Sequence, residues 1–117
     1  MEERKTLRKI IIYGDHYWDF YYSQNKKTRK RISWVIDVIR TEKFINAKYF
    51  KHLEGTRGLY EIRIQAGNDI FRIFCCFDEG CLVVLFNGFQ KKSDKTPQGE
   101  IERALKLKNE YYESKKK

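Results

Sequence analysis

The stretch GLYEIRIQAGNDIFRIFCCFDEGCLVVLFNGF, residues 58–89, contains three apolar runs separated by two short turn sequences. The first run, residues 58–65, alternates between two faces, as expected of a strand with one side against a core. The second and third runs, residues 70–77 and 81–89, are apolar on both faces apart from Arg72, and so need cover on both sides or a strongly curled sheet. The turn sequences AGND and DEG have hairpin chemistry. The stretch therefore predicts an antiparallel meander of three strands.

The region before the meander begins with a predicted strand and a predicted short helix. The apolar run within residues 8–14 indicates a strand that ends at Gly14. Residues 15–24 are dense in aromatic side chains, and Asp15 could cap a short helix there.

Residues 25–50 predict further helical structure. Asn25 or Thr28 could cap a long helix over residues 25–43. Its inward face is marked by aliphatic residues at helical spacing, namely Ile32, Val35, Ile36 and Ile39. A second, short helix is predicted over residues 42–50, with these residues turned inward: Phe44, Ala47 and either Tyr49 or Phe50.

The segment after the meander has the signals of a helix start. Thr96 lies at an expected N-cap and Pro97 at the first helical position. The expected inward stripe consists of Ile101, Ala104, Leu105 and Tyr112, and the final residues ESKKK are expected to fray. The predicted fold is α+β in the order β-α-α-β-β-β-α, with a curled antiparallel sheet, an N-terminal helical pair and a C-terminal helix. The length and the lack of a linker suit one domain over residues 1–117.

The balance of charge favours an anionic partner. Lysine and arginine together number 25 and aspartate and glutamate 16, which gives a formal net charge of +9. Such an excess suits nucleic acid, an acidic protein or an anionic membrane surface. No apolar run approaches the roughly 18 residues of a membrane-spanning helix, and the start MEERKTLRK followed by IIIY is unlike a signal peptide. The sequence therefore predicts a cytoplasmic protein.

Several common site chemistries find little support in the sequence. Cys75, Cys76 and Cys81 form no CxxC pair and are expected to be small buried apolar residues in a reducing compartment, with a zinc site as the less favoured alternative. His16 and His52 are isolated and are expected at the surface or partly packed. No Gly-rich phosphate loop is present. Aromatic residues are expected mainly in the core, although three of them could stack on bases: Trp18, Tyr21 and Tyr22.

The charged residues of the meander are expected to gather on one surface. Glu61 and Arg63 lie on one strand face, and the first turn brings Arg72 beside Arg63. Arg72 has two interpretations, a structural ion pair with Glu61 or a phosphate clamp at the mouth of a basic cleft. Three lysines follow the third strand: Lys91, Lys92 and Lys95. Alone they would indicate a solvated loop, but together with the arginine pair they favour a phosphodiester ligand.

Residues 51–111 resemble the RelE/HigB superfamily of bacterial toxins, and most of all its HigB, phage-protein-like branch. The resemblance rests on L..G..GLYEIRI, on FRIF and on VVLFNGFQKKSDKTPQGEIERA. It implies a RelE-like fold with a curled sheet of four or five strands. It also implies the toxin of a toxin–antitoxin system, a ribosome-dependent endoribonuclease that cleaves mRNA in the ribosomal A site without a metal or other cofactor.

The implied reaction is attack of a 2′-hydroxyl on the adjacent phosphate. It needs a base, a proton donor for the leaving 5′-oxygen, and cations beside the developing phosphorane charge. By position, Arg63 and Arg72 would hold and neutralise the phosphate, while Lys91 and Lys92 would grip the substrate or ribosomal RNA. Glu61 stands where RelE members often have lysine, and it is either the base or a group that orients Arg72.

The resemblance also implies partners and a proton donor. The segment DKTPQG stands where RelE-type enzymes have a catalytic tyrosine, which leaves Lys92 or Lys95 as the candidate donor. The implied partners are mRNA, the ribosome and a co-encoded antitoxin, often a helix-turn-helix protein, that would cover the basic cleft or pack on the helical side.

Two other functions fit parts of the sequence. ParE-like relatives share the fold and inhibit DNA gyrase without cleaving nucleic acid, but they generally lack a full cationic cleft. A nucleic-acid-binding module without catalysis would need only the positive charge.

Overall fold

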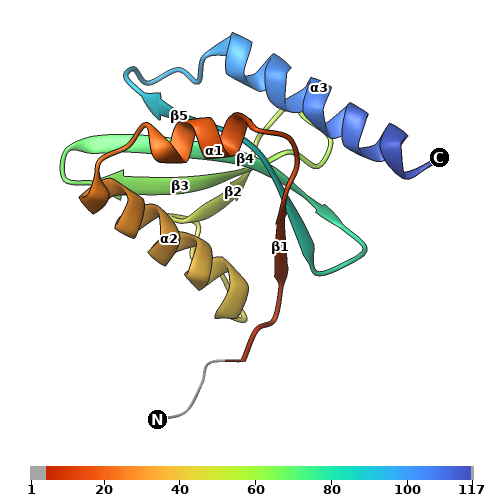
Figure 1. Cartoon of the computed structure of the whole chain (residues 1–117), viewed down its shortest axis with the longest axis horizontal. Helices are drawn as coiled ribbons and strands as arrows, with labels where there is room; N and C mark the ends of the chain where they lie inside the picture. The colour runs from red at the N-terminus through yellow and green to blue at the C-terminus, as the bar shows by residue number, and fades with distance from the viewer. Residues whose placement is uncertain (1–4, 117) are drawn as a thin grey trace.

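The computed structural model describes residues 5–116 and has the α+β architecture that the sequence predicts (Figure 1). Its elements in chain order are β1 (Lys9–Ile12), α1 (His16–Tyr22), α2 (Lys26–Thr41), β2 (Phe50–His52), β3 (Tyr60–Ala66), β4 (Asp69–Asp78), β5 (Leu82–Lys91) and α3 (Gln98–Lys115). α3 includes part of the ESKKK segment that was predicted to fray. Within residues 5–116, none of the helices combines the length and apolar character that crossing a membrane requires.

The five strands form one mixed sheet in the order β1-β5-β4-β3-β2. β3, β4 and β5 are the predicted antiparallel meander, and β2 extends it antiparallel to β3. β1 lies parallel to β5, with Lys9 opposite Leu82 and Ile12 opposite Leu85. The sheet is therefore antiparallel apart from the β1–β5 pair, and it does not close into a barrel.

Two tight turns fix the register of the meander. The first closes between the paired residues Ala66 and Asp69. In the second, residues 79–81 lie between the paired Asp78 and Leu82, and Glu79 and Gly80 have left-handed φ values of 47° and 77°. Both turns fall where the sequence predicts them, so the pairing of β3 with β4 and of β4 with β5 follows from local signals.

Next to a bulge in β5, a glycine allows α1 to lie close to the sheet. The pairing shifts between Ile73, which is opposite Gly88, and Cys75, which is opposite Leu85. A Cβ added to Gly88 would lie 2.4 Å from the ring of Phe20 in α1. Because glycine has no Cβ, it permits this approach of helix to strand.

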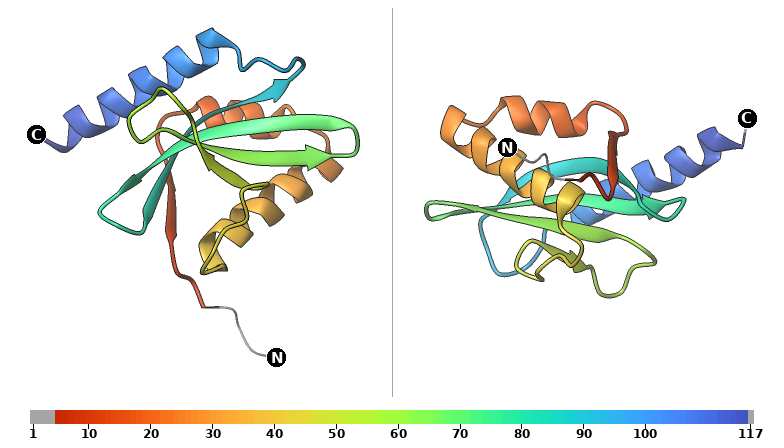
Figure 2. Two further views of the ribbon diagram at one scale, coloured as in Figure 1. Left: turned by 180° about the vertical axis from the view of Figure 1, so that it is seen from behind. Right: turned by 90° about the horizontal axis from the view of Figure 1, so that it is seen from below.

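The sheet carries a hydrophobic core on each face. α1 and α2 lie together on one side of the sheet (Figure 2), where the buried residues include Tyr17, Phe20, Ile32, Val35, Ile39, Ile62, Ile64 and Leu85. α3 packs on the other side, where the buried residues include Leu59, Phe74, Cys76, Val84, Phe86, Ala104, Leu107 and Tyr111. Strands β4 and β5 are therefore covered on both faces, which explains their two-sided apolar sequences.

The predicted N-cap of α2 is confirmed, whereas that of α1 is confirmed in position only. Asn25 caps α2, since its Oδ1 accepts a hydrogen bond from the backbone nitrogen of Thr28 at 2.8 Å. Asp15 occupies the N-cap position of α1, but its side chain makes no capping hydrogen bond. Three of the four predicted inward residues of α2 are buried and Ile36 is partly buried against the same core.

The helix predicted over residues 42–50 is wrong. The segment turns instead, and Phe50 begins β2. Phe44, expected to face inward, is 84% exposed, and Ala47 is exposed as well. Tyr49 and Phe50 are partly buried against the core, as predicted, although from an extended segment.

A contact with the N-terminal segment explains where α2 ends. The Arg8 guanidinium donates hydrogen bonds to the carbonyl oxygens of Ile39 and Glu42 at 2.9 and 2.7 Å. Without these bonds, the carbonyl oxygens would need a donor from a further helical turn or from water. Beyond this point Phe50 stacks on Tyr60 of β3, with ring centroids 5.1 Å apart, so pairing with β3 replaces local helix formation.

α3 begins one residue later than predicted. Pro97, and not Thr96, is its N-cap; Pro97 has an extended ψ of 125°, and its carbonyl oxygen accepts from the backbone nitrogen of Ile101 at 3.3 Å. The helix therefore begins at Gln98.

The inward stripe of α3 differs from the prediction at one residue. Ala104 is buried, and Ile101 and Tyr112 pack against the core as predicted. Leu105 is instead 38% exposed, whereas Leu107 and Tyr111 are buried.

Candidate functional site

Two arginines lie opposite each other on the α3 side of the sheet. Arg63 of β3 and Arg72 of β4 are paired in register, and directly opposed residues of neighbouring strands have Cβ atoms about 4.5–5.5 Å apart. The Arg63 side chain is 30% exposed, whereas that of Arg72 is 8% exposed. The structure thus brings together the predicted pair, with Arg63 as the more accessible member.

Glu61 lies close to both guanidinium groups. Its Oε1 is 3.4 Å from Nε of Arg63 and 3.9 Å from Nε of Arg72. The ion pair between Glu61 and Arg72 that the sequence suggests is therefore present. We call Glu61, Arg63 and Arg72 the arginine cluster. Its single carboxylate offsets only part of the repulsion between two cations.

The arginine cluster contains buried polar atoms that have no hydrogen-bond partner among the residues described, namely Oε2 of Glu61 and Nε of both Arg63 and Arg72. Arg72 uses Nη1 to donate a hydrogen bond to the carbonyl oxygen of Phe71 at 3.0 Å. Burial and then the charge of Arg63 lower the pKa of Arg72, while Glu61 opposes the shift. A buried unpaired polar atom costs roughly 1–3 kcal/mol. These unpaired atoms reduce what the cluster contributes to stability, and Arg63, at 30% exposure, is its most accessible cation.

The three predicted lysines lie at the end of β5 and in the loop after it. Lys91 is the last residue of β5 and pairs with Ile70. It is therefore a diagonal neighbour of Arg72 on the same face, about 7–8 Å away. Lys92 and Lys95 are exposed in the loop that leads to α3. The structure thus joins Lys91 to the arginine surface and places the other two lysines beside it in the chain.

A further cation of this surface was not predicted from the sequence. Lys51 of β2 is exposed and pairs directly with Glu61 of β3, so it projects from the same face as the arginine cluster. Alternation along a strand over residues 50–52 would have indicated this position. The helix wrongly predicted over residues 42–50 obscured it.

Asn87 is a second polar residue that the sequence analysis missed. It lies at the bulge of β5 and is 1% exposed. Its Nδ2 donates hydrogen bonds to Oε1 and to the carbonyl oxygen of Glu100, at 3.1 and 3.2 Å. An asparagine within an otherwise apolar strand was the available signal. Asn87 fastens the first turn of α3 to the sheet and thereby sets the end of the loop over residues 92–97, which we call the lysine loop.

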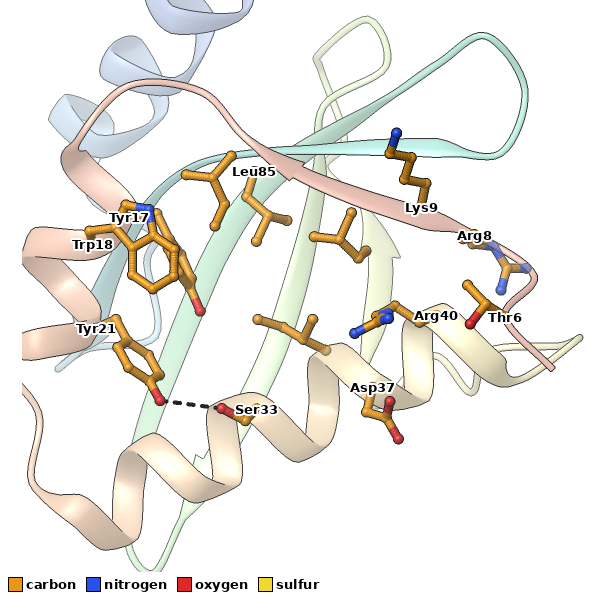
Figure 3. Close-up of a pocket in the computed structure, with 13 residues that line it drawn as sticks. Thr6, Arg8, Lys9, Tyr17, Trp18, Tyr21, Ser33, Asp37, Arg40 and Leu85 are labelled. Carbon is orange, nitrogen blue, oxygen red and sulfur yellow. Dashed lines mark hydrogen bonds between the residues drawn. The ribbon is translucent and has the colours of Figure 1, made fainter. Parts of the chain in front are cut away.

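A large hollow lies on the opposite face of the sheet from the arginine cluster. It has a volume of about 900 Å³ and is bounded by β1, α1 and α2 (Figure 3). Trp18 and Tyr21 of α1 line one side, and Arg40 of α2 lies across from them. The basic cleft expected at the arginines remains a prediction.

A second ionic cluster joins the end of β4 to the end of α3. The Tyr111 hydroxyl donates a hydrogen bond to Oδ2 of Asp78 at 2.7 Å, and Lys115 Nζ donates to the same oxygen. These two hydrogen bonds, with that from Lys115 first, lower the pKa of Asp78. Burial and the bond to Asp78 raise the pKa of Tyr111 to about 12. We call Asp78, Tyr111 and Lys115 the aspartate cluster; it fastens α3 to the β4–β5 turn.

The cysteines and histidines mostly follow expectation. Cys75 and Cys76 are buried, and burial raises the pKa of both thiols. Cys81, predicted to be buried, is exposed at the β4–β5 turn. His16 and His52 are exposed. Across residues 5–116, no group of three or more His, Cys, Asp or Glu side chains is arranged to hold a metal ion.

Comparison with known proteins identifies a protein family that the chain matches. Residues 19–109 match the family model described as "Phage derived protein Gp49-like (DUF891)". No curated protein shows a significant match to the chain. The matched region extends from within α1 into α3, so it contains the whole arginine cluster and the lysine loop.

Proposed function

Because the chain belongs to the phage-derived Gp49-like family, which is related to the RelE/HigB-like toxins, we propose that it is the toxin of a toxin–antitoxin system. We propose further that it is a HigB-type, ribosome-dependent endoribonuclease that cleaves mRNA. The observation that supports a nuclease is the register pair Arg63–Arg72, held near Glu61 with buried nitrogen atoms left unpaired within the described chain.

The proposed reaction is attack of an mRNA 2′-hydroxyl on the adjacent phosphate. The O2′–P bond forms as the 2′-hydroxyl loses its proton to water, and the P–O5′ bond breaks as the 5′-oxygen takes a proton. The products are a 2′,3′-cyclic phosphate and a free 5′-hydroxyl. Arg63, the more exposed arginine, contacts the non-bridging oxygens. Arg72 is more deeply buried and adds positive charge next to Arg63. Preorganised cations at this position stabilise the extra negative charge of the phosphorane.

In this mechanism Glu61 orients the arginines. Its Oε1 lies within 4 Å of both Nε atoms, and its side chain is 9% exposed, so it is less accessible to RNA than Arg63. Lys91 holds the RNA backbone beside the arginine cluster. Lys92, exposed in the loop that follows, donates the proton to the leaving 5′-oxygen.

We propose a co-encoded antitoxin, of helix-turn-helix type, as the protein partner. Membership of a toxin–antitoxin family supports an antitoxin. The net charge of +9 and the cations beside the arginine cluster favour an antitoxin that covers this surface with acidic side chains.

The test is cleavage of a defined mRNA by the purified protein, with and without ribosomes, with the new 5′ ends mapped. Cleavage that requires ribosomes and is lost in Arg72→Ala supports the proposal. Arg103→Ala is the matched control, because Arg103 is 50% exposed on α3 and pairs with Glu100. Absence of cleavage in both conditions would overturn the nuclease proposal. Inhibition of gyrase supercoiling by the same sample would instead favour the ParE-like function.

A further inference from the structure

A basic surface is formed by the first two turns of α2, on the face of the sheet opposite the arginine cluster. Residues 26–31 read KKTRKR, and the first turn of α2 contains no acidic residue. Lys26 and Lys30 have no carboxylate partner within residues 5–116, and Arg29 Nε is buried without a hydrogen bond there. Cations that repel one another, and that lie at the positive end of the helix dipole, reduce the stability of the helix. Folding alone therefore does not account for them.

Exposed aromatic rings lie on α1, and one of their neighbours, Tyr21, lines a hollow together with these cations. Trp18 and Tyr22 are stacked, with ring centroids 5.7 Å apart and planes inclined by 24°. They are 41% and 65% exposed. Tyr21 packs edge-on against both rings, and its hydroxyl is 3.4 Å from Oγ of Ser33 in α2. The aromatic group is thereby fixed to α2 while its outer faces stay open to solvent.

Two hollows that share Tyr21 connect the cations to the aromatic rings. The smaller has a volume of about 440 Å³ and is lined by Tyr21, Lys26, Arg29, Lys30 and Ser33. The larger is the hollow of about 900 Å³ in Figure 3, which has Trp18 and Tyr21 on one side and Arg40 and the carboxylate of Asp37 on the other. The hollows thus connect the cations through Tyr21 to Trp18, on which Tyr22 is stacked, so the surface offers both cations and exposed aromatic rings, as binding to phosphates and bases requires.

We propose that this α1–α2 surface, made of Trp18, Tyr21, Tyr22, Lys26, Arg29 and Lys30, binds single-stranded RNA. The cations contact phosphates, and Tyr22 and Trp18 stack on bases. An acidic protein would be attracted by the same charge, but the open, stacked rings favour bases. The inference goes beyond the proposed function, because it adds an RNA contact remote from the arginine cluster, and it rests on that function only in that both involve RNA.

The first test measures binding of a fluorescein-labelled 20-nucleotide oligouridine to the full chain by anisotropy over a range of salt concentrations. The double variant Lys26→Gln/Lys30→Gln should bind more weakly, and the slope of log affinity against log salt should fall by about 1.4 if each lysine contacts one phosphate. The control Lys106→Gln/Lys116→Gln removes two exposed charges, one in α3 and one at its C-cap, and should have little effect. Equal losses in the two double variants would show that only net charge matters and would overturn the proposal.

The second test addresses stacking. Tyr22→Ala should weaken oligouridine binding roughly 5- to 100-fold, while Tyr22→Phe should bind like the wild type. Binding of inorganic polyphosphate, which has no bases, should be unchanged in Tyr22→Ala. If Tyr22→Ala bound oligouridine with wild-type affinity, the proposed RNA surface would be refuted. Tighter binding of polyglutamate than of oligouridine at equal salt would also refute it and would point to an acidic protein.

Arg72→Ala separates this inference from the proposed function. It should lose ribosome-dependent cleavage and keep the Tyr22-dependent binding of oligouridine, because the two sites lie on opposite faces of the sheet. A wild-type protein that cleaves mRNA, yet binds oligouridine no differently after Tyr22→Ala, would refute the α1–α2 surface alone. A protein that cleaves nothing, yet binds through Tyr22, would refute the nuclease alone.

Discussion

The arginine cluster and the aspartate cluster lie on the same side of the sheet and differ in how well their polar atoms are satisfied. In the aspartate cluster, one carboxylate oxygen accepts hydrogen bonds from both Tyr111 and Lys115. In the arginine cluster, the contacts of Glu61 with the two Nε atoms are longer, at 3.4 and 3.9 Å, and buried atoms have no hydrogen-bond partner within the described chain. A satisfied cluster stabilises the fold, whereas an unsatisfied buried cluster opposes it. The difference in satisfaction is consistent with a structural role for the aspartate cluster and with the binding role that we propose for the arginine cluster.

The largest expected effect is that of Arg72→Ala on activity. Loss of its charge should reduce ribosome-dependent cleavage about 100- to 1000-fold, which corresponds to roughly 3–4 kcal/mol of transition-state stabilisation. The melting temperature should change little, because Arg63 remains 3.4 Å from Glu61 and keeps that carboxylate paired. Cleavage and thermal melting should be measured on the same sample.

A loss of stability in Arg72→Ala would give the arginine cluster a structural role, like that of the aspartate cluster. If Arg72 served only to pair Glu61, the variant should lose roughly 3–5 kcal/mol of stability. A variant that melts and cleaves like the wild type would leave Arg72 without either role.

Glu61→Gln should have the next largest effect. The amide keeps the shape of the side chain but no longer offsets the repulsion between Arg63 and Arg72, so cleavage should fall about tenfold, or roughly 1.4 kcal/mol. The pH dependence of the rate should keep its shape. A loss of 10²- to 10⁴-fold, together with the disappearance of the acidic limb of the pH profile, would make Glu61 the general base instead.

Asp78→Asn should act on stability and leave cleavage unchanged. The folded pKa of Asp78 lies below its ordinary value of 3.8, so its stabilising effect is present above that value and is lost as the pH falls through the folded pKa. The variant should therefore melt a few degrees below the wild type at neutral pH, and the difference should shrink below about pH 4. A constant difference down to pH 2 would contradict this assignment.

Lys91→Ala should have the smallest effect. Because Lys91 is a diagonal neighbour of Arg72, its loss should weaken ribosome binding and reduce the salt slope by about 0.7–0.9, while the rate at saturation stays the same. Lys106→Ala is the matched control, since Lys106 is exposed on α3. A lower rate at saturating ribosomes would place Lys91 in the chemistry and not only in binding.

Local signals were sufficient for the meander and for the arginine pair. Alternation placed Glu61 and Arg63 on one face, and the two-residue turn then fixed Arg72 opposite Arg63. The end of α2 was predicted within two residues, but the extended segment after it was not, because it depends on Arg8, which is distant in sequence and binds the carbonyl oxygen of Glu42, and on the pairing of Phe50 with β3.

The remaining errors also have non-local causes. Lys51 joins the arginine surface only through the pairing of β2 with β3. Leu105 and Leu107 both fit a helical stripe with Ala104, and the way α3 lies on the sheet selects Leu107. Asn87 reaches its partner Glu100 only once α3 has docked.

The parallel pairing of β1 with β5 has a consequence for how the chain folds during synthesis. Lys9 pairs with Leu82 and Ile12 with Leu85, so β1 has no neighbour until most of the chain has been made. Synthesis proceeds at about 5–20 residues per second, so the three isoleucines of β1 stay unpaired for several seconds after they are made. A growing chain can form the hairpin that carries Arg63 and Arg72 before the sheet is complete. We therefore expect full activity to appear only when translation has passed β5, which delays the moment at which a proposed ribosome toxin could act on the ribosome that makes it.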